Sequence, residues 1–141
     1  IYATDISLKA LDTAHENVRK HGTDNVQLFH HDFLKDNFNV NFDVVVSNPP
    51  YISLDEINSL QIEVKNFDPY SALTDGYDGF VFYKHFANKF ESLVKPEGYM
   101  LLEIDGEFHK NKLKPLFEEA GLQTIFYKDL QGSSRVIKVF K

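Results

Sequence analysis

The chain of 141 residues contains no cysteine. This absence excludes a disulfide framework and a cysteine-ligated metal site, and it is compatible with a reducing compartment. The sequence also has no apolar run approaching about 18 residues, and it does not open with a charged-then-apolar leader. We therefore expect a soluble, cytoplasmic protein with no membrane partner.

Basic residues are few for a protein that binds nucleic acid. Lys and Arg number 15 against 21 Asp and Glu, which gives a net charge of -6. Neutralising many phosphates requires the opposite balance, so nucleic acid is disfavoured as a direct substrate. A local basic patch is still compatible with this total.

Clustered glycines are missing as well. The 7 glycines include no Gly-x-Gly, the spacing found in loops that cradle phosphates. The chain does contain 43% apolar and 14% aromatic residues, which is typical of a globular core rather than of disorder. Its length suits a single domain over residues 1–141, or a piece of one. Because residues 1–5 have the pattern of a buried strand already under way, we interpret the chain as a piece of a longer protein.

The hydrophobic spacing alternates between strand and helix patterns along the chain. Strands are predicted at residues 1–5, 26–29, 42–46, 99–104, 122–130 and 135–140, and helices between Ser7 and Gly22, at 80–93 and at 111–120. Residues 53–79 are predicted to be a long irregular insert, and the last two strands form a hairpin. This order predicts an α/β fold with an open, mostly parallel sheet and an antiparallel end. The continuous apolar run at 42–46 predicts a strand covered on both faces.

The most informative motif follows that strand, where residues 47–52 read Ser-Asn-Pro-Pro-Tyr-Ile. Asn48 has a side-chain carbonyl that can accept a hydrogen bond, and Pro49, stiffened by Pro50, has a free backbone carbonyl. Two acceptors can grip one NH2 group, and Tyr51 can form an aromatic wall beside a flat substrate. A planar amide or aromatic amine is a poor nucleophile, so this grip would aim its nitrogen at an electrophile. The alternative is a Pro-Pro turn that merely ends a strand.

Other polar residues end neighbouring predicted strands. Ligands of such sheets lie across the carboxyl ends of the strands. Asp5 could take both hydroxyls of a ribose there, or it could cap the following helix. Asp32 could accept from an adenine amine while the ring of Phe33 flanks the purine; the alternative is a surface turn. Glu103 could reach the same cleft or be a solvated strand end, and we leave it unassigned.

Metal chemistry is not predicted. His30, His31 and Asp32 resemble ligands, but adjacent strand residues point to opposite faces and no partner has zinc spacing. Asp75 and Asp78 beside glycines suggest a calcium loop, yet the acidic positions and closing Glu of that motif are absent. We interpret this stretch as a turn.

Taken together, the motifs resemble one family, the HemK-type protein-(glutamine-N5) methyltransferases that modify the Gly-Gly-Gln glutamine of peptide chain release factors. The resemblance rests on Thr4-Asp5-Ile6-Ser7, His31-Asp32-Phe33, residues 47–52, Asp68-Pro69, Ala72-Leu73, Asp78-Gly79-Phe80, Tyr83, Leu102-Glu103-Ile104 and the closing stretch 129–136. It covers nearly the whole chain. Asn-Pro-Pro-Tyr is shared with DNA adenine methyltransferases, whereas the segment from Asp68 to Tyr83 resembles the glutamine branch.

The resemblance implies a Rossmann-like fold and S-adenosylmethionine as the methyl donor. It implies Asp5 on the ribose, Asp32 and Phe33 around the adenine, and Asn48 bordering the cofactor. It also implies that Asn48, Pro49, Pro50 and Tyr51 form the catalytic motif, with Asn48 and the Pro49 carbonyl holding the amide of a release-factor glutamine. The insert 53–79 would then form a wall for the release-factor loop.

The chain departs from the family pattern at several points. The family's first strand, its glycine-rich cofactor loop and its preceding helical domain have no counterpart in these residues, so we expect weak cofactor binding or none by this chain alone. Thr74-Asp75-Gly76 stands where paired glycines are usual, and Asp68 replaces a Glu. Two alternatives stay open: a nucleic-acid adenine methyltransferase that acts on a flipped base, and a noncatalytic fragment of the fold.

Overall fold

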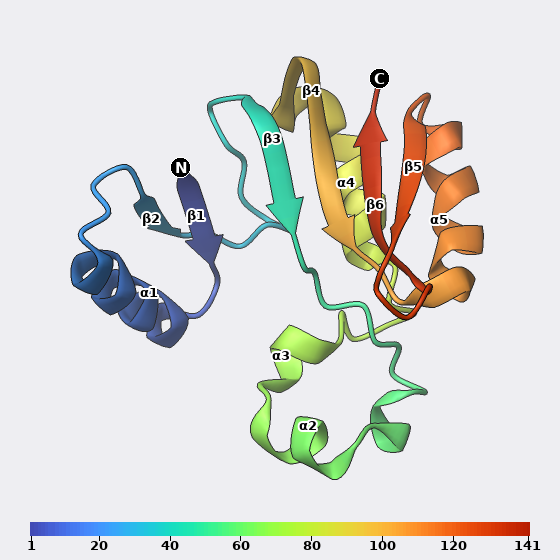
Figure 1. The fold of residues 1–141 in the computed structure, drawn as a ribbon, viewed down its shortest axis with the longest axis horizontal. Coiled ribbons are helices and arrows are strands. Elements are labelled where there is room, and N and C mark those ends of the chain that lie inside the picture. Colours follow the sequence, from blue (N-terminus) through green and yellow to red (C-terminus); the bar gives the residue numbers. More distant parts are fainter. The chain divides into compact units, whose positions relative to one another are not determined.

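The computed structural model describes residues 1–141, which divide into two compact units, residues 1–37 and residues 38–141. Each unit has its own β-sheet (Figure 1). None of the helices combines the length and the apolar character needed to cross a membrane.

The first unit is a strand, a helix and a second strand. Strands β1 (Tyr2–Asp5) and β2 (Gln27–His30) pair in parallel, with Asp5 opposite His30. Helix α1 (Leu8–His21) connects them. It begins after Ser7, whose Oγ accepts a hydrogen bond from the Ala10 N–H, and it ends at Gly22 in the left-handed conformation that favours glycine. The predicted limits of this helix are confirmed.

The second unit is built on a four-stranded sheet. Its strands are β3 (Phe42–Ser47), β4 (Val94–Glu103), β5 (Gln123–Lys128) and β6 (Ser134–Phe140), in the order β3-β4-β6-β5. β3 and β4 are parallel, whereas β6 runs antiparallel to both β4 and β5. The α/β class and the antiparallel hairpin at the end of the chain are therefore confirmed.

The core of the second unit lies between this sheet and two helices. Helices α4 (Val81–Leu93) and α5 (Gly106–Glu119) contact each other and pack against the sheet (Figure 1). Alternate residues of the central strands and one side of each helix are buried together. The fully buried side chains include Tyr83, Met100, Leu102, Ile104, Leu113, Phe117, Ile137 and Val139. This alternation is the period-2 pattern of a strand with one face on the core.

The sequence analysis was wrong about the second face of β3. The continuous apolar run predicts cover on both sides, but Val44 is 41% exposed and Val46 is 73% exposed. Both side chains point to the same face, because residues two apart in a strand do so. Within the second unit β3 pairs only with β4, so it is an edge strand of the four-stranded sheet.

The largest differences from the prediction lie in the insert and at the starts of α5 and β4. The insert contains a 3-10 helix (Ile57–Ser59), α2 (Ile62–Phe67) and α3 (Tyr70–Leu73) instead of being wholly irregular. These helices are too short for a visible 3.6-residue pattern and bury nothing, so the sequence gives little signal for them. α5 begins at Gly106 rather than Asn111, and β4 begins at Val94 rather than Tyr99, with a register shift near its start.

Candidate active site

The Asn-Pro-Pro-Tyr motif lies directly beyond the carboxyl end of β3. Ser47, the last residue of the strand, pairs with Leu102 of β4, so the motif begins at the edge where β4 also ends. Asn48 is exposed and Pro49 is buried. The motif therefore presents a free polar side chain on a backbone that is packed into the protein.

The side chain of Tyr51 is half-buried and has two partners in the protein. Its hydroxyl donates a hydrogen bond to Glu103 Oε1 at 3.2 Å, and its ring meets the ring of His109 edge-on, with centroids 5.6 Å apart. Burial, together with the nearby charge of Glu103, raises the pKa of Tyr51. The phenol is therefore a neutral hydrogen-bond donor at physiological pH.

Glu103 is a site residue that the sequence analysis left unassigned. It is the last residue of β4, and its backbone carbonyl accepts a hydrogen bond from the Tyr83 hydroxyl at 2.5 Å. Tyr83 is fully buried, and this burial raises its pKa. The signal for Glu103 was its position: a polar residue at the carboxyl end of the strand next to β3 lies beside the motif that follows β3.

His109 was missed altogether. It lies inside α5 with 5% of its surface exposed, and its Nδ1 accepts a hydrogen bond from the Asp105 N–H at 3.3 Å. Burial lowers its pKa, against an opposing effect of the charges of Asp105 and Glu56. The ring is therefore neutral, and because Nδ1 is the acceptor, Nε2 carries the proton. Its environment depends on long-range packing, which the sequence did not show.

The turn before α4 packs directly against the motif. The carboxylate of Asp75 accepts hydrogen bonds from the N–H groups of Tyr77, Gly79 and Val81, at 2.8, 3.1 and 2.9 Å. Gly79 has a φ of +82°, and a Cβ built there would lie 2.3 Å from the carbonyl oxygen of Tyr51. The hydrogen bonds of Asp75 thus all go to backbone N–H groups of this turn. They fix the turn in which Gly79 contacts the backbone carbonyl of Tyr51.

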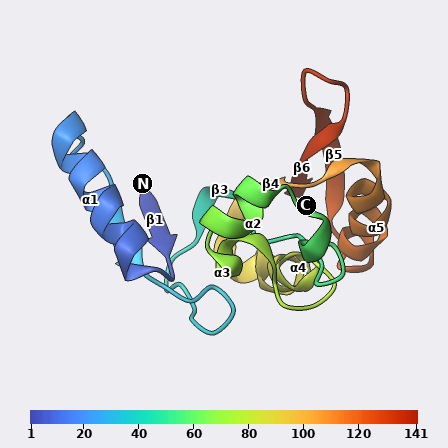
Figure 2. The same cartoon turned by 90° about the horizontal axis from the view of Figure 1, so that it is seen from below.

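The insert returns to the motif by two backbone hydrogen bonds. Ile52 N–H donates to the Leu73 carbonyl and Leu54 N–H to the Tyr77 carbonyl, each at 3.0 Å. The intervening short helices lie beyond the carboxyl ends of β3 and β4 (Figures 1 and 2). The insert is therefore tied to the motif at both of its ends.

The other predicted site residues belong to the first unit. Asp5 and Asp32 both lie at the carboxyl end of the β1–β2 pair, where the Asp5 carbonyl accepts from the His31 N–H at 3.1 Å. Asp5 is exposed and accepts from the Ser7 N–H at 2.7 Å, while Ser7 is the cap of α1. Asp5 is thus not the helix cap that the alternative interpretation proposed.

Both carboxylate oxygens of Asp32 have partners, whereas Asp5 uses one of its oxygens. One of its oxygens accepts from the Leu34 N–H at 3.1 Å, and the other contacts the Lys35 ammonium at 2.8 Å. The hydrogen bond from Lys35 holds the pKa of Asp32 below its usual value. Asp32 therefore forms part of a turn. Phe33 beside it is half-buried.

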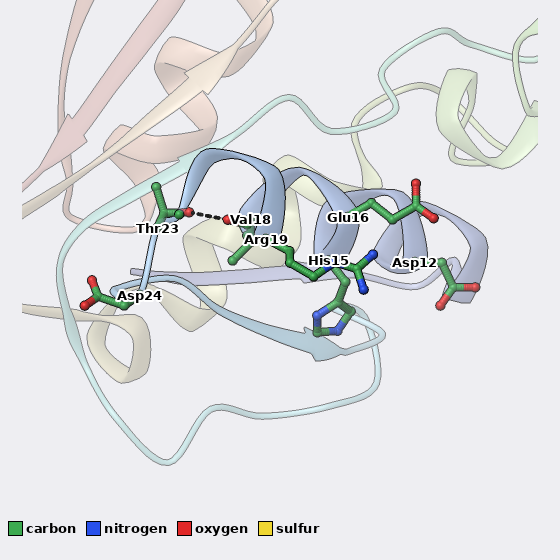
Figure 3. Close-up of a pocket in the computed structure, with 8 residues that line it drawn as sticks. Asp12, His15, Glu16, Val18, Arg19, Thr23 and Asp24 are labelled. Carbon is green, nitrogen blue, oxygen red and sulfur yellow. Dashed lines mark hydrogen bonds between the residues drawn. The ribbon is translucent and has the colours of Figure 1, made fainter.

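Each unit also has a surface hollow. One of about 900 Å³ lies along α1 and the turn after it, where Thr23 Oγ1 donates to the Val18 carbonyl (Figure 3). None of the predicted site residues lines it. The hollow in the second unit has a volume of about 990 Å³, and Phe80 and His109 are among the residues that line it. It therefore lies next to Tyr51, because the ring of His109 contacts the ring of Tyr51.

Comparison with known proteins decides the family. Residues 2–128 match the Eco57I restriction-modification methylase family. The chain belongs to this family of methylases. The resemblance to the HemK-type enzymes is confirmed by a "Release factor glutamine methyltransferase" of Fusobacterium nucleatum, which is 38% identical over 134 residues, or 94% of this chain and 38% of that protein. A "Bifunctional methyltransferase" of Rickettsia felis is 41% identical over 140 residues, or 97% of this chain and 26% of that protein.

The solved structures agree on the fold of this methylase. A methyltransferase from Pyrococcus furiosus superposes with a TM-score of 0.70 at 22% identity, covering 99% of this chain and 61% of that one. The fold is therefore the Rossmann-like methyltransferase fold. The chain spans about a quarter to about half of the length of the relatives it matches.

Proposed function

We propose that residues 1–141 form part of a single catalytic domain that uses S-adenosylmethionine to methylate the side-chain nitrogen of a protein glutamine, in a peptide chain release factor. The observation that carries the proposal is the geometry of the Asn-Pro-Pro-Tyr motif. Asn48 is exposed directly after β3, and the Tyr51 hydroxyl is hydrogen-bonded to Glu103. The name of the Fusobacterium nucleatum relative supports the substrate.

The first unit fits the cofactor. Asp5 is an exposed carboxylate at a strand end, with one oxygen engaged by the Ser7 N–H and the other available to a ribose hydroxyl. Asp32 could turn from the exposed Lys35 side chain toward an adenine amine, beside the ring of Phe33. When bound, S-adenosylmethionine supplies an electrophilic methyl group on a positively charged sulfur.

The second unit would supply the grip on the substrate. The side-chain carbonyl of Asn48 and the backbone carbonyl of Pro49 would each accept one of the two amide hydrogens of the glutamine. This grip fixes the plane of the amide, so the weak nitrogen nucleophile meets the methyl group in line. The nitrogen would take the methyl group as the methyl–sulfur bond breaks, which would leave neutral S-adenosylhomocysteine, and one amide proton would pass to solvent. The rate enhancement would come from orientation rather than from a strong base.

A second candidate function is methylation of an adenine amine in DNA. The description of the matching family, a restriction-modification methylase, favours it, and the same motif could hold a flipped base. The net charge of -6 opposes it, because DNA binding needs neutralised phosphates.

Methyl transfer to matched substrates tests the proposal. The full-length product of the gene is incubated with S-adenosylmethionine carrying a labelled methyl group and with a release factor, the same release factor with Gly-Gly-Gln changed to Gly-Gly-Asn, or an adenine-containing duplex. We expect label only on the first substrate, and its loss in Asn48→Ala. Label on the duplex instead would establish the second candidate.

Cofactor binding is tested separately by calorimetric titration of S-adenosylmethionine. We expect binding by the full-length product, loss of binding in its Asp5→Ala variant, and little or no binding by residues 1–141 alone. Tight binding by the short chain would contradict the predicted need for a glycine-rich loop.

A further inference from the structure

Tyr51 is held at three separate points, two on its side chain and one on its backbone. Glu103 accepts from its hydroxyl, His109 packs against the edge of its ring, and Gly79 lies against its backbone carbonyl. An aromatic residue that served only as a wall for a substrate would not need its hydroxyl fixed as well.

Glu103 is itself fixed in place but not neutralised. Its backbone is held by the Tyr83 hydroxyl and by pairing with Val136 of β6. Arg135 of the closing hairpin pairs with Asp105 at 3.2 Å and with Asp129 at 3.5 Å. A half-buried carboxylate without a cationic partner costs free energy, so its contact with Tyr51 calls for a role beyond stability.

Two prolines connect Tyr51 to the acceptors of the substrate amide. The rings of Pro49 and Pro50 fix their φ angles near -65°, so few torsions separate Tyr51 from the Pro49 carbonyl. A displacement of the Tyr51 backbone would therefore be transmitted to this carbonyl and to Asn48, and the anchored Tyr51 side chain opposes such a displacement.

We propose that Glu103 is a positioning residue: through its hydrogen bond with the Tyr51 hydroxyl, it holds the Asn48 side chain and the Pro49 carbonyl in the orientation that grips the substrate amide. This inference rests on the proposed function of the motif. Glu103 acts through Tyr51 and not as a base toward the substrate, because its Oε1 accepts the hydrogen bond of the Tyr51 hydroxyl.

Three variants of the full-length protein test this role. Glu103→Gln keeps an acceptor oxygen at the same distance, Glu103→Leu removes it, and Tyr51→Phe removes the donor but keeps the ring. We expect Glu103→Leu and Tyr51→Phe each to lower kcat for methyl transfer by about ten- to a hundredfold, the scale of a small misplacement of reacting groups. The double variant Glu103→Leu/Tyr51→Phe should lose no more kcat than either single variant. Glu103→Gln should retain most of the activity.

Controls separate positioning from general damage. Glu119→Leu, at the exposed end of α5, is the matched Glu-to-Leu change outside the site and should leave kcat unchanged. The KM for S-adenosylmethionine should change less than kcat in all variants, because Asp5, Asp32 and Phe33 are left intact. Thermal unfolding identifies any variant that fails to fold, and Glu103→Gln and Tyr51→Phe then still test the proposal.

The proposal is overturned if the losses in the double variant multiply, or if Glu103→Gln is as inactive as Glu103→Leu, which would make the carboxylate a base. A readout without activity distinguishes this failure from that of the proposed function. In the parent protein, NMR of ring-labelled tyrosine should show Tyr51 titrating at higher pH than in Glu103→Gln. If this difference appears but no glutamine is methylated, the contact stands and the proposed function is wrong.

Discussion

Gly79 shows how closely single residues of the site are fitted to one another. A methyl group at this position would collide with the Tyr51 carbonyl, and the backbone there has a conformation that disfavours any side chain. Gly76 in the same turn has a similar φ of +80° but nothing within 4 Å of a built Cβ. The two glycines thus separate backbone strain from steric conflict.

We expect Gly76→Ala to lower the free energy of unfolding by about 1 kcal/mol and Gly79→Ala by about 2–4 kcal/mol, because only the second adds a clash to the strain. Urea unfolding measures both values. In the full-length protein, methyl transfer should survive Gly76→Ala and be lost in Gly79→Ala. Equal destabilisation by the two changes would show that the contact with Tyr51 is not tight.

His109 predicts a pH dependence of stability. Burial lowers its pKa in the folded protein, whereas the unfolded chain has the ordinary value of about 6.5. As the pH falls, the unfolded chain therefore binds the proton first, and unfolding becomes more favourable. The contribution of the neutral ring is fully present above about pH 6.5 and is lost as the pH falls from there through the lower folded-state pKa.

Urea unfolding between pH 8 and pH 5 measures this dependence. His109→Gln should remove part of the loss of stability below about pH 6.5, since Gln does not titrate. An unchanged pH slope in the variant would show that His109 is not held neutral in the folded protein.

Helices and strands with local start and stop signals could be predicted from the sequence, whereas elements without such signals could not. α1 has a capping serine and a terminating glycine, both of which are local signals, so its limits were read correctly. The closing hairpin likewise has its own turn. By contrast, the start of α5 is preceded by Asp105, which makes no capping hydrogen bond with its side chain, and local chemistry gave no sign of it.

The turn before α4 is the element whose stability depends most on one side chain. Asp75→Ala leaves three N–H groups without their acceptor, so we expect a loss of about 1–3 kcal/mol and a loosened turn. Hydrogen exchange of the Tyr77, Gly79 and Val81 amides measures the second effect directly. Asp78→Ala is the comparison, since Asp78 accepts from only one backbone N–H, that of Phe80, and from the ammonium group of Lys84. Equal protection in both variants would contradict the role of Asp75.

At the scale of the whole molecule, the class of fold and the predicted strand ends were readable because they depend on the order of elements. The partnership of Tyr51 with Glu103 and His109 was not, since it joins residues more than 50 positions apart in the sequence. The cofactor-binding role of Asp5, Asp32, Phe33 and Asn48 stays a prediction, and so does the catalytic role of Asn48, Pro49, Pro50 and Tyr51.

The exposed face of β3 and its place at the edge of the four-stranded sheet predict the behaviour of the isolated chain. Exposed apolar side chains on an edge strand favour association between copies, and a charge on such a strand opposes it. We expect residues 1–141 to self-associate in sedimentation velocity and Val46→Lys to reduce this. Thr13→Lys on α1 is the control for added charge. If both variants sediment alike, the face of β3 is not the contact.

The two hydrogen bonds that tie the insert back to the motif have a further consequence. Ile52 and Leu54 are fixed to Leu73 and Tyr77, and the short helices between these ties bury no residue of their own. We therefore expect residues 60–68 to tolerate changes of length or sequence without disturbing the groups that would hold the amide, whereas Glu56 accepts hydrogen bonds from the N–H and hydroxyl of Ser53 beside the motif. Under the proposed function, such an arrangement would allow the target to change through one external segment while the groups that hold the amide are kept.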